Sequence, residues 1–538
     1  MHRALQIDEI VGMICVQISR AGPSDWSAGL PTEEYSSYCD DLARLARTCT
    51  AFLDPALDAL WSFQGTLLYL LRTMPSDLWD IEVTPYGEDS DADCDDPEND
   101  IFLDISLKRT SRTSDWDRFS FYARRVRSFK DAHASEGTSV VYDTLAANFP
   151  SGTIFPKLQI LDWSPLDGEL FHHVHIFLCT RITRLELNLD LATDFAIFKT
   201  LLTTFTGLKN LNLCTGFDDV NIHSVTRDPL FRRFLCSMQD LETFVTPSLD
   251  SETLDHLSRL PRLRYLALMS DTPPRLPPRP NHLPCFPALS SFECESLEAA
   301  PNLLERTGKS LIEFRVSSSI RATSPTKKIY QQLCDALASS CTHTLLEEIT
   351  VDKACDEQPI NPTQLDLYAV SGDDLRILFC FRNLLYVSLA HCIAVDLDDT
   401  VALDMARAWP CIELLAFPCD TTHRIKPRMT LEGVYAFAQH CPLLEELSIL
   451  FDATTVPTLK LTTEGKKQRR VSQEQLTFLN VAYSHIGTTE KEGWRVADFL
   501  LTIFPELETV TVMELNSSAG EQALAMHEAW IQLCEDFF

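Results

Sequence analysis

The chain has 538 residues and a formal net charge of −31, from 46 Lys and Arg residues against 77 Asp and Glu residues. Its length is typical of several domains or of one long repeat array. Hydrophobic residues make up 45% and charged residues 23%, a composition unlike that of disordered or fibrous proteins. Because so negative a chain is repelled by phosphate backbones and anionic lipids, we expect neither nucleic acid nor a membrane as its main partner.

The N-terminus and the cysteines indicate an intracellular protein. Asp8 and Glu9 interrupt the first apolar run, and no small-residue cleavage site follows it, as a secretory signal would need. No apolar stretch reaches the roughly 18 to 20 residues that span a bilayer. The 18 cysteines form no Cys-x-x-Cys pair, which is typical of buried thiols in a reducing compartment. We therefore expect a cytoplasmic or nuclear protein, or one found in both compartments.

The first 71 residues have a helical pattern. Apolar residues between Ile7 and Ile18 share one helical face, and a second helix is predicted from about Asp40. A third is predicted from Asp54-Pro55, where a capping side chain precedes a proline at the first helical position. Three short helices make a marginal domain that a partner would stabilise.

Residues 88–104 are strongly acidic, and we expect a solvated loop because such a run repels itself. Asp91, Asp93 and Asp95 alternate as the oxygen ligands of a calcium loop do. The glycine and the glutamate that such a loop needs at its sixth and twelfth positions are missing, which favours the solvated loop.

An apolar phrase, Leu-x-x-Leu-x-Leu in its ideal form, recurs from about Phe155 onward. Its thirteen copies begin at residues 158, 182, 208, 241, 263, 289, 311, 346, 384, 412, 444, 476 and 507. The last two apolar positions of each copy alternate like the inward residues of a short strand, and the segments between copies have helical spacing. This pattern predicts an α/β array of stacked strand and helix repeats. A doubly wound α/β domain is the alternative, but it favours fewer, longer strands and a glycine-rich turn.

The repeats resemble those of leucine-rich repeat proteins of the irregular type, in which parallel strands line the inside of a curved solenoid and helices the outside. The string from Leu42 to Trp61 resembles the second half of an F-box of the large fungal families. The string from Leu5 to Ile10 resembles its opening motif, with Asp8 where a proline is expected. The resemblance divides the chain into an F-box-like helical domain (1–71), a linker or cap region (72–154) and a leucine-rich repeat solenoid (155–538).

This combination implies the substrate receptor of a Skp-cullin-F-box (SCF) ubiquitin ligase. Its F-box would bind the Skp adaptor and, through it, the cullin, while the repeats would bind an unidentified target protein. Because such a receptor supplies proximity to another protein's active site, the resemblance implies no catalytic residue, metal or cofactor. The residues implied for binding the Skp adaptor are Leu5, Ile10, Ile14, Leu42, Leu45, Cys49, Phe52, Leu57 and Trp61.

Two alternatives remain open at this point. The N-terminal helices could only cap a leucine-rich repeat scaffold that has no ubiquitin role. An enzyme or small-molecule receptor could also be built on the strand surface. The sequence lacks the glycine-rich, nucleophile and His-Glu-x-x-His motifs that would favour an enzyme.

Three further motifs each have a structural interpretation that we favour. His172, His173 and His175 could ligate a metal, but no cysteine or carboxylate motif completes a set, so we expect a packed or exposed histidine cluster. The proline-rich segment 273–280 is interpreted as a stiff loop rather than a polyproline ligand. The basic run 466–470 is interpreted as a solvated loop insertion rather than a nuclear import signal.

The substrate surface is predicted from the strand geometry alone. Residues at the fifth and seventh positions of a phrase face away from the core, since side chains alternate along a strand. The candidate substrate-binding residues are Glu186, Asn188, Asn212, Glu293, Glu295, Arg315, Ser388, Ser448, Asn480 and Thr511.

Overall fold

The computed structural model describes two compact units, Met1–Thr253 and Leu254–Phe538, which are treated separately here. The described residues are 8–20, 33–85, 101–130, 139–149, 152–164, 168–188, 197–205, 207–214, 228–247, 249–269, 286–307, 310–318, 326–353, 365–390, 395–417, 426–458, 462–464, 467–469, 472–513 and 521–537. Among the helices in these segments, none combines the length and the apolar character that crossing a bilayer requires. The cysteines in these segments are free thiols.

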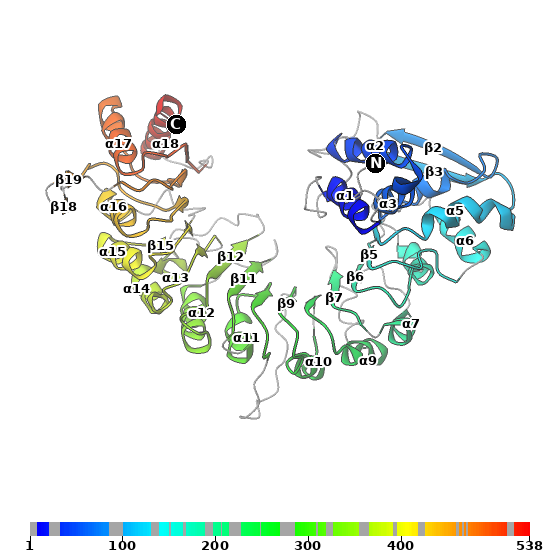
Figure 1. Ribbon diagram of the computed structural model, residues 1–538. Helices are drawn as coiled ribbons and strands as arrows, with labels where there is room; N and C mark the ends of the chain where they lie inside the picture. Colours follow the sequence, from blue (N-terminus) through cyan, green and yellow to red (C-terminus); the bar gives the residue numbers. More distant parts are fainter. Residues whose placement is uncertain are drawn as a thin grey trace. The chain divides into compact units, whose positions relative to one another are not determined.

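Three helices lie together at the start of the first unit (Figure 1). They share a small apolar core. They are α1 (Asp8–Arg20), α2 (Glu33–Ala46) and α3 (Thr50–Leu60). The core contains Val11 and Cys15 from α1, Leu42 and Ala46 from α2, and Ala56 from α3. Val11 and Cys15 lie about one turn apart, so α1 buries one narrow stripe of its surface. We call this group of three helices the helical cluster.

The second and third helices begin earlier than predicted. α2 begins at Glu33 rather than near Asp40, and α3 begins at Thr50 rather than at Pro55. Pro55 therefore lies inside α3, where it removes one backbone donor from the helix. Asp54 does not cap the helix, because Cys49 occupies the N-cap position. The Asp54 carboxylate accepts a hydrogen bond of 2.5 Å from Arg125.

After the helical cluster, the first unit alternates short strands and helices. Its further elements are β1 (Phe63–Gln64), α4 (Leu68–Leu71), β2 (Trp79–Pro85), β3 (Ile101–Leu107), η2 (Thr113–Asp115), α5 (Trp116–Ala123), β4 (Ser128–Lys130), α6 (Ser139–Asn148), β5 (Ile160–Trp163), η4 (Gly168–Ile176), β6 (Arg184–Asn188), α7 (Ile197–Thr204), β7 (Asn210–Cys214), α9 (Pro229–Ser237), β8 (Thr243–Thr246) and the start of α10 (Ser251–Leu257). Six strands form a parallel ladder in the order β1-β4-β5-β6-β7-β8. Strands β2 and β3 form a separate antiparallel hairpin.

The second unit continues the same alternation. Its elements are β9 (Tyr265–Leu268), β10 (Ser291–Cys294), α11 (Ala300–Thr307), β11 (Glu313–Ser318), α12 (Lys327–Ser340), β12 (Glu348–Lys353), α13 (Leu365–Tyr368), β13 (Val370–Ser371), α14 (Gly372–Leu375), η7 (Arg376–Cys380), β14 (Tyr386–Ser388), β15 (Val395–Asp396), α15 (Asp399–Ala408), β16 (Leu414–Ala416), α16 (Leu431–His440), β17 (Glu446–Ser448), β18 (Thr462–Glu464), β19 (Lys467–Arg469), β20 (Phe478–Asn480), α17 (Glu490–Ile503), β21 (Thr509–Thr511) and α18 (Glu521–Phe537). Its parallel ladder has the order β9-β10-β11-β12-β14-β16-β17-β20-β21. In Figure 1, α11, α12, α15 and α16 form a row beside these strands.

Each of the thirteen repeat phrases contains one strand of these ladders, from β5 to β21. The inward residues of neighbouring strands lie opposite one another, as in the register of Phe314 with Ile349 and of Ile349 with Val387, and all three are buried. The large parallel sheet and its helices confirm the predicted α/β repeat architecture. In each unit the strand order rises along the chain without reversal, whereas a doubly wound sheet would reverse it.

The parallel strands begin before Phe155, where the solenoid was expected to start. Strand β1 lies within the segment predicted as helical, and β4 lies within the predicted linker region. β4 pairs with β5, with Phe129 opposite Leu161. The parallel ladder of the first unit therefore begins at β1, shortly after the end of α3.

Two predicted loops contain strands. β3 begins at Ile101, so the acidic loop ends before residue 104, and residues 86–100 lie outside the described segments. β19 covers Lys467–Arg469 of the basic run and pairs with β18 as an antiparallel hairpin. The proline-rich segment 273–280 lies outside the described segments.

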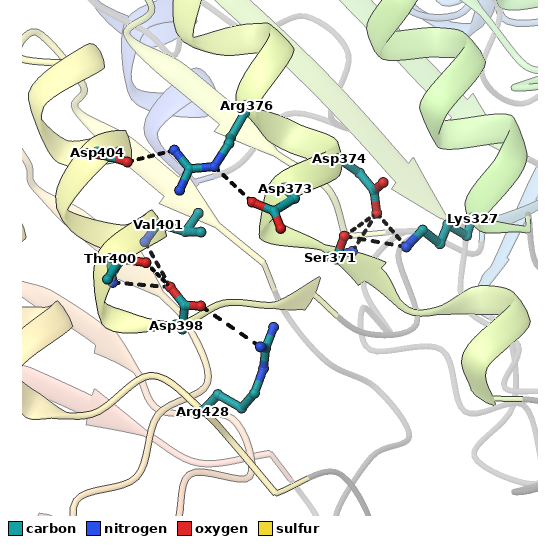
Figure 2. A network of polar contacts seen from close by, with 10 residues as sticks. All are labelled: Lys327, Ser371, Asp373, Asp374, Arg376, Asp398, Thr400, Val401, Asp404 and Arg428. Atoms are coloured by element: carbon teal, nitrogen blue, oxygen red, sulfur yellow. Dashed lines mark hydrogen bonds and ion pairs between the residues drawn. The ribbon is translucent and has the colours of Figure 1, made fainter.

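Polar side chains cap and join the helical segments of the second unit, as Figure 2 shows. Asp398 accepts hydrogen bonds from the backbone N–H groups of Thr400 and Val401, at 3.1 and 2.9 Å, and so caps α15. Arg376 donates to Asp404 of that helix at 2.6 Å and to Asp373 of α14 at 2.8 Å. These contacts connect one helical segment to the next along the array.

Asp374 forms a second group of contacts in the same view (Figure 2). It accepts hydrogen bonds from the backbone N–H and the hydroxyl of Ser371, at 2.9 and 2.5 Å, and lies 2.8 Å from Nζ of Lys327 on α12. Burial alone would raise the pKa of Asp374, but Lys327, Ser371 and Gln331 lower it to about 2. The carboxylate therefore ties α12 to the start of α14.

Candidate functional site

The helical cluster exposes large apolar side chains beside its buried core. On α1, Met13, Ile14 and Val16 are exposed, and on α3 Leu53 is exposed. Large apolar side chains that a small domain leaves exposed are candidates for contact with another protein. We call these four residues the apolar group of the helical cluster.

The residues expected to bind the Skp adaptor differ in how exposed their side chains are. Ile14 is 37% exposed, whereas Leu42 is only 2% exposed and belongs to the core of the cluster. Half-buried positions are occupied by Ile10, Leu45, Cys49, Phe52, Leu57 and Trp61, and Leu5 lies outside the described segments. Of these, Leu45, Phe52 and Leu57 pack against the core, as expected of residues that hold helices together.

The side chain of Trp61 contacts another residue of the first unit. Its ring stacks on that of Tyr122, with 4.4 Å between centroids and 26° between planes. Nearby, the guanidinium of Arg125 is 5% exposed, donates to Asp54 at 2.5 Å and also pairs with Asp58. Burial opposes the charge of Arg125, but its hydrogen bonds to the two carboxylates raise its pKa above the usual value. These contacts attach α3 to the segment around α5.

A second candidate surface is the solvent-facing side of the strands in the second unit. The residues opposite one another in register form a row of mostly polar side chains: Ala267, Glu293, Arg315, Thr350, Ser388, Ala416, Ser448, Asn480 and Thr511. We call this the polar row. It brings together six of the predicted substrate-binding residues from six strands.

Glu293 is the centre of a hydrogen-bonded group in the polar row. Its two carboxylate oxygens accept hydrogen bonds from the hydroxyls of Tyr265, at 2.6 Å, and of Ser317, at 2.7 Å. Burial and, to a smaller extent, the hydrogen bond to Glu293 raise the pKa of Tyr265, so the phenol remains a donor. The carboxylate is thereby held in one orientation. Glu295 lies just beyond the end of the same strand and is half-buried.

Arg315 lies next to Glu293 in register and forms a bidentate pair with Glu348, at 2.5 and 2.8 Å. The hydrogen bonds to Glu348 raise the pKa of Arg315, which stays charged. Asp352 lies further along β12 and accepts a hydrogen bond from Ser388 at 3.3 Å, while burial raises its pKa. Arg315 also pairs with Glu313 at 3.4 Å. The carboxylates of Glu293, Glu313, Glu348 and Asp352 thus outnumber the one guanidinium in this part of the polar row, which favours cationic partners.

Three predicted residues lie in the first unit. Glu186 and Asn212 are opposite each other on β6 and β7, and burial raises the pKa of Glu186. Asn188 ends β6 opposite Cys214, whose pKa is raised to about 11 by burial. These three side chains are half-buried and belong to a polar group of their own.

At the C-terminal end of the polar row, the three predicted residues are less available to a partner. Ser448 is 8% exposed, so it offers little surface to a partner. The Asn480 side chain accepts a hydrogen bond of 2.8 Å from the backbone N–H of Ala482, which has a φ of 49°. That contact stabilises a left-handed turn, a structural role typical of asparagine. Thr511 is half-buried on β21.

Residues at the third position of each phrase face the same side but were not among the predicted residues. Tyr265 and Glu348 both occupy this position, two residues after the first leucine of their phrases. The alternation of side chains along a strand predicts them, because positions three, five and seven share one face.

No protein-family model matches this chain, and no curated protein matches it significantly.

Proposed function

We propose that this protein is a substrate-recognition adaptor of an SCF-type ubiquitin ligase. The helical cluster acts as an F-box that binds the Skp adaptor and, through it, the cullin. The parallel ladder acts as a leucine-rich repeat surface that binds a target protein. The chain itself performs no chemistry and acts in the cytoplasm, the nucleus or both.

The observation that carries this proposal is the apolar group on the helical cluster. A cluster with so small a core gains stability when a partner covers the apolar side chains that it leaves exposed. The string from Leu42 to Trp61 supplies the resemblance to an F-box, and its helices α2 and α3 supply the expected two-helix arrangement.

Co-expression of the full chain with a Skp adaptor, followed by size-exclusion chromatography, tests the proposal. We expect a stable complex with the wild-type chain that is lost in Ile14→Asp and Leu53→Asp, because a buried unpaired carboxylate is costly at an interface. Leu345→Asp is the matched control, since Leu345 is 42% exposed in the second unit and Leu53 is 41% exposed.

Each possible result has a distinct meaning. A folded wild-type chain that forms no complex rejects the adaptor function and favours the alternative, a repeat scaffold without a ubiquitin role. A complex that survives both cluster substitutions rejects the apolar group as the binding surface. The attachment of α3 through Arg125 and Trp61 is the feature that favours the scaffold alternative, because it is what an internal cap needs.

The polar row suggests that the target presents basic residues. Charge reversal at Glu293 and Glu295 is expected to weaken the binding of a labelled lysine-rich peptide about fivefold, from about 1 kcal/mol for two partly exposed charges. Fluorescence anisotropy at low salt measures this change. The same reversal at Glu298 and Glu305, just before and within α11, is the control, and an equal loss in both variants would reject a specific site.

A further inference from the structure

The sequence places three histidines close together, and the structure adds a carboxylate to them. His172 and His173 lie on η4, and Asp143 lies on α6. One ligand atom from each of these three residues lies within 4.8 Å of the other two. The imidazole rings of His172 and His173 are 3.8 Å apart between centroids. Two imidazoles and a carboxylate are a common set of protein ligands for zinc.

The distance between Asp143 and His173 fits a metal better than a hydrogen bond. Nε2 of His173 lies 3.5 Å from Oδ1 of Asp143. A hydrogen bond between nitrogen and oxygen is usually about 2.7 to 3.2 Å long. Two ligands of a tetrahedral zinc ion, each about 2.0 to 2.1 Å from the metal, lie about 3.4 Å from each other. The observed separation agrees with the second geometry.

The burial of His173 leaves one of its ring nitrogens in need of a further partner. His173 is 3% exposed, and among the described residues no group hydrogen-bonds to its Nδ1. The hydroxyl of Tyr142 is also buried and lacks a partner among the described residues, and its ring stacks on that of His173 at 5.6 Å. An ion held by Nε2 beside Asp143 does not satisfy Nδ1. Buried polar atoms are almost always satisfied, and a water at Nδ1 would be the outer-shell partner that a metal-bound imidazole usually has.

We propose that Asp143, His172 and His173 bind a Zn²⁺ ion. His173 supplies the buried ligand, whereas Asp143 and His172 are exposed and close the site from the solvent side. With three protein ligands, the fourth position is open to water. The ion joins α6 to η4 and thereby fixes the return segment between β5 and β6. The proposal is independent of the adaptor function.

Zinc titration of the full-length chain, in competition with a chromophoric chelator, tests the site. We expect one tightly bound ion per wild-type chain, and affinity at least about tenfold weaker in His172→Ala and in Asp143→Asn, since even outer-shell partners contribute that much. His343→Ala is the control. His343 is an exposed histidine of the second unit outside the ligand set, so this variant keeps the wild-type affinity.

Cobalt substitution separates this site from the cysteines. Co²⁺ bound by nitrogen and oxygen gives d–d bands without the charge-transfer band of a thiolate ligand. Because the two replaced side chains are exposed, circular dichroism of the metal-free variants is expected to match that of the wild type. The proposal is overturned if zinc does not bind, if His172→Ala binds it as tightly as the wild type, or if the first equivalent of Co²⁺ shows a thiolate band.

Discussion

Arg125 connects the helical cluster to the rest of the first unit, and its replacement should loosen that cluster selectively. Arg125→Met keeps most of the apolar stem and removes the charged head group, so the pairs with Asp54 and Asp58 are lost. Breaking a buried ion pair usually costs about 3 to 5 kcal/mol. Here the cost is smaller, because Asp54 is 74% exposed and Asp58 is 40% exposed, so water solvates both carboxylates after the change.

Hydrogen bonds to charged groups contribute about 1.5 to 3 kcal/mol. We therefore expect the free energy that separates the closed and the open form of the helical cluster to fall by about 2 kcal/mol. This corresponds to about a 30-fold increase in the population of its open form. Hydrogen–deuterium exchange followed by mass spectrometry measures the effect locally, in the helical cluster and in the second unit separately. The amides of α1, α2 and α3 are expected to lose protection together.

Two controls make this test specific. Arg124→Met removes the charge of the exposed neighbouring arginine and should leave the exchange of the cluster unchanged. The amides of the second unit serve as an internal reference in both variants. If Arg125→Met changes protection in the cluster by less than about twofold, or lowers it equally in the second unit, Arg125 is not the attachment described here.

Two further perturbations test the packing and the electrostatics of the second unit. Gly433→Ala on α16 is expected to cost about 1 to 3 kcal/mol in urea unfolding, because the added Cβ would lie 2.5 Å from Cγ of Met429. Gly493→Ala on α17 has no atom nearer than 3.9 Å and should be neutral or stabilising by up to about 1 kcal/mol, so equal losses would contradict the packing argument. Asp374 has a folded-state pKa of about 2, below its unfolded value, so its contribution to stability is complete above about pH 4 and is lost as the pH falls through 2. Asp374→Asn should therefore flatten the dependence of stability on pH between about 4 and 2, and an unchanged acid titration followed by circular dichroism would refute this role of Asp374.

The repeat strands could be predicted because each phrase carries its own signal. The alternation of buried residues, such as Leu447 and Ile449, is local and survives an uneven period. Strands β1 and β4 could not be found in this way, because the last apolar residue of the phrase is replaced by Gly65 at β1 and by Asp131 at β4. Their pairing depends on neighbouring strands rather than on a pattern of their own.

The candidate sites were predicted less well, because they depend on tertiary contacts. The resemblance identified Leu42 as a binding residue, but α2 turns that side chain into the core of the cluster. The histidines were noticed in the sequence, whereas Asp143 comes from another helix 29 residues before His172, and no local spacing connects the two. Glu348 was missed because only two of the three outward positions of a phrase were considered.

Each repeat contributes one strand to the ladder, and this arrangement affects how the binding specificity of the strand surface could change. In the second unit each strand of the ladder bonds only to the strands beside it, and each contributes a few outward side chains. Strands two places apart are separated by about 9.6 Å, near the distance beyond which substitutions usually act independently. Changes in affinity made on alternate strands should therefore add. Specificity for a ligand could then be altered in small separate increments, without redesign of the whole surface.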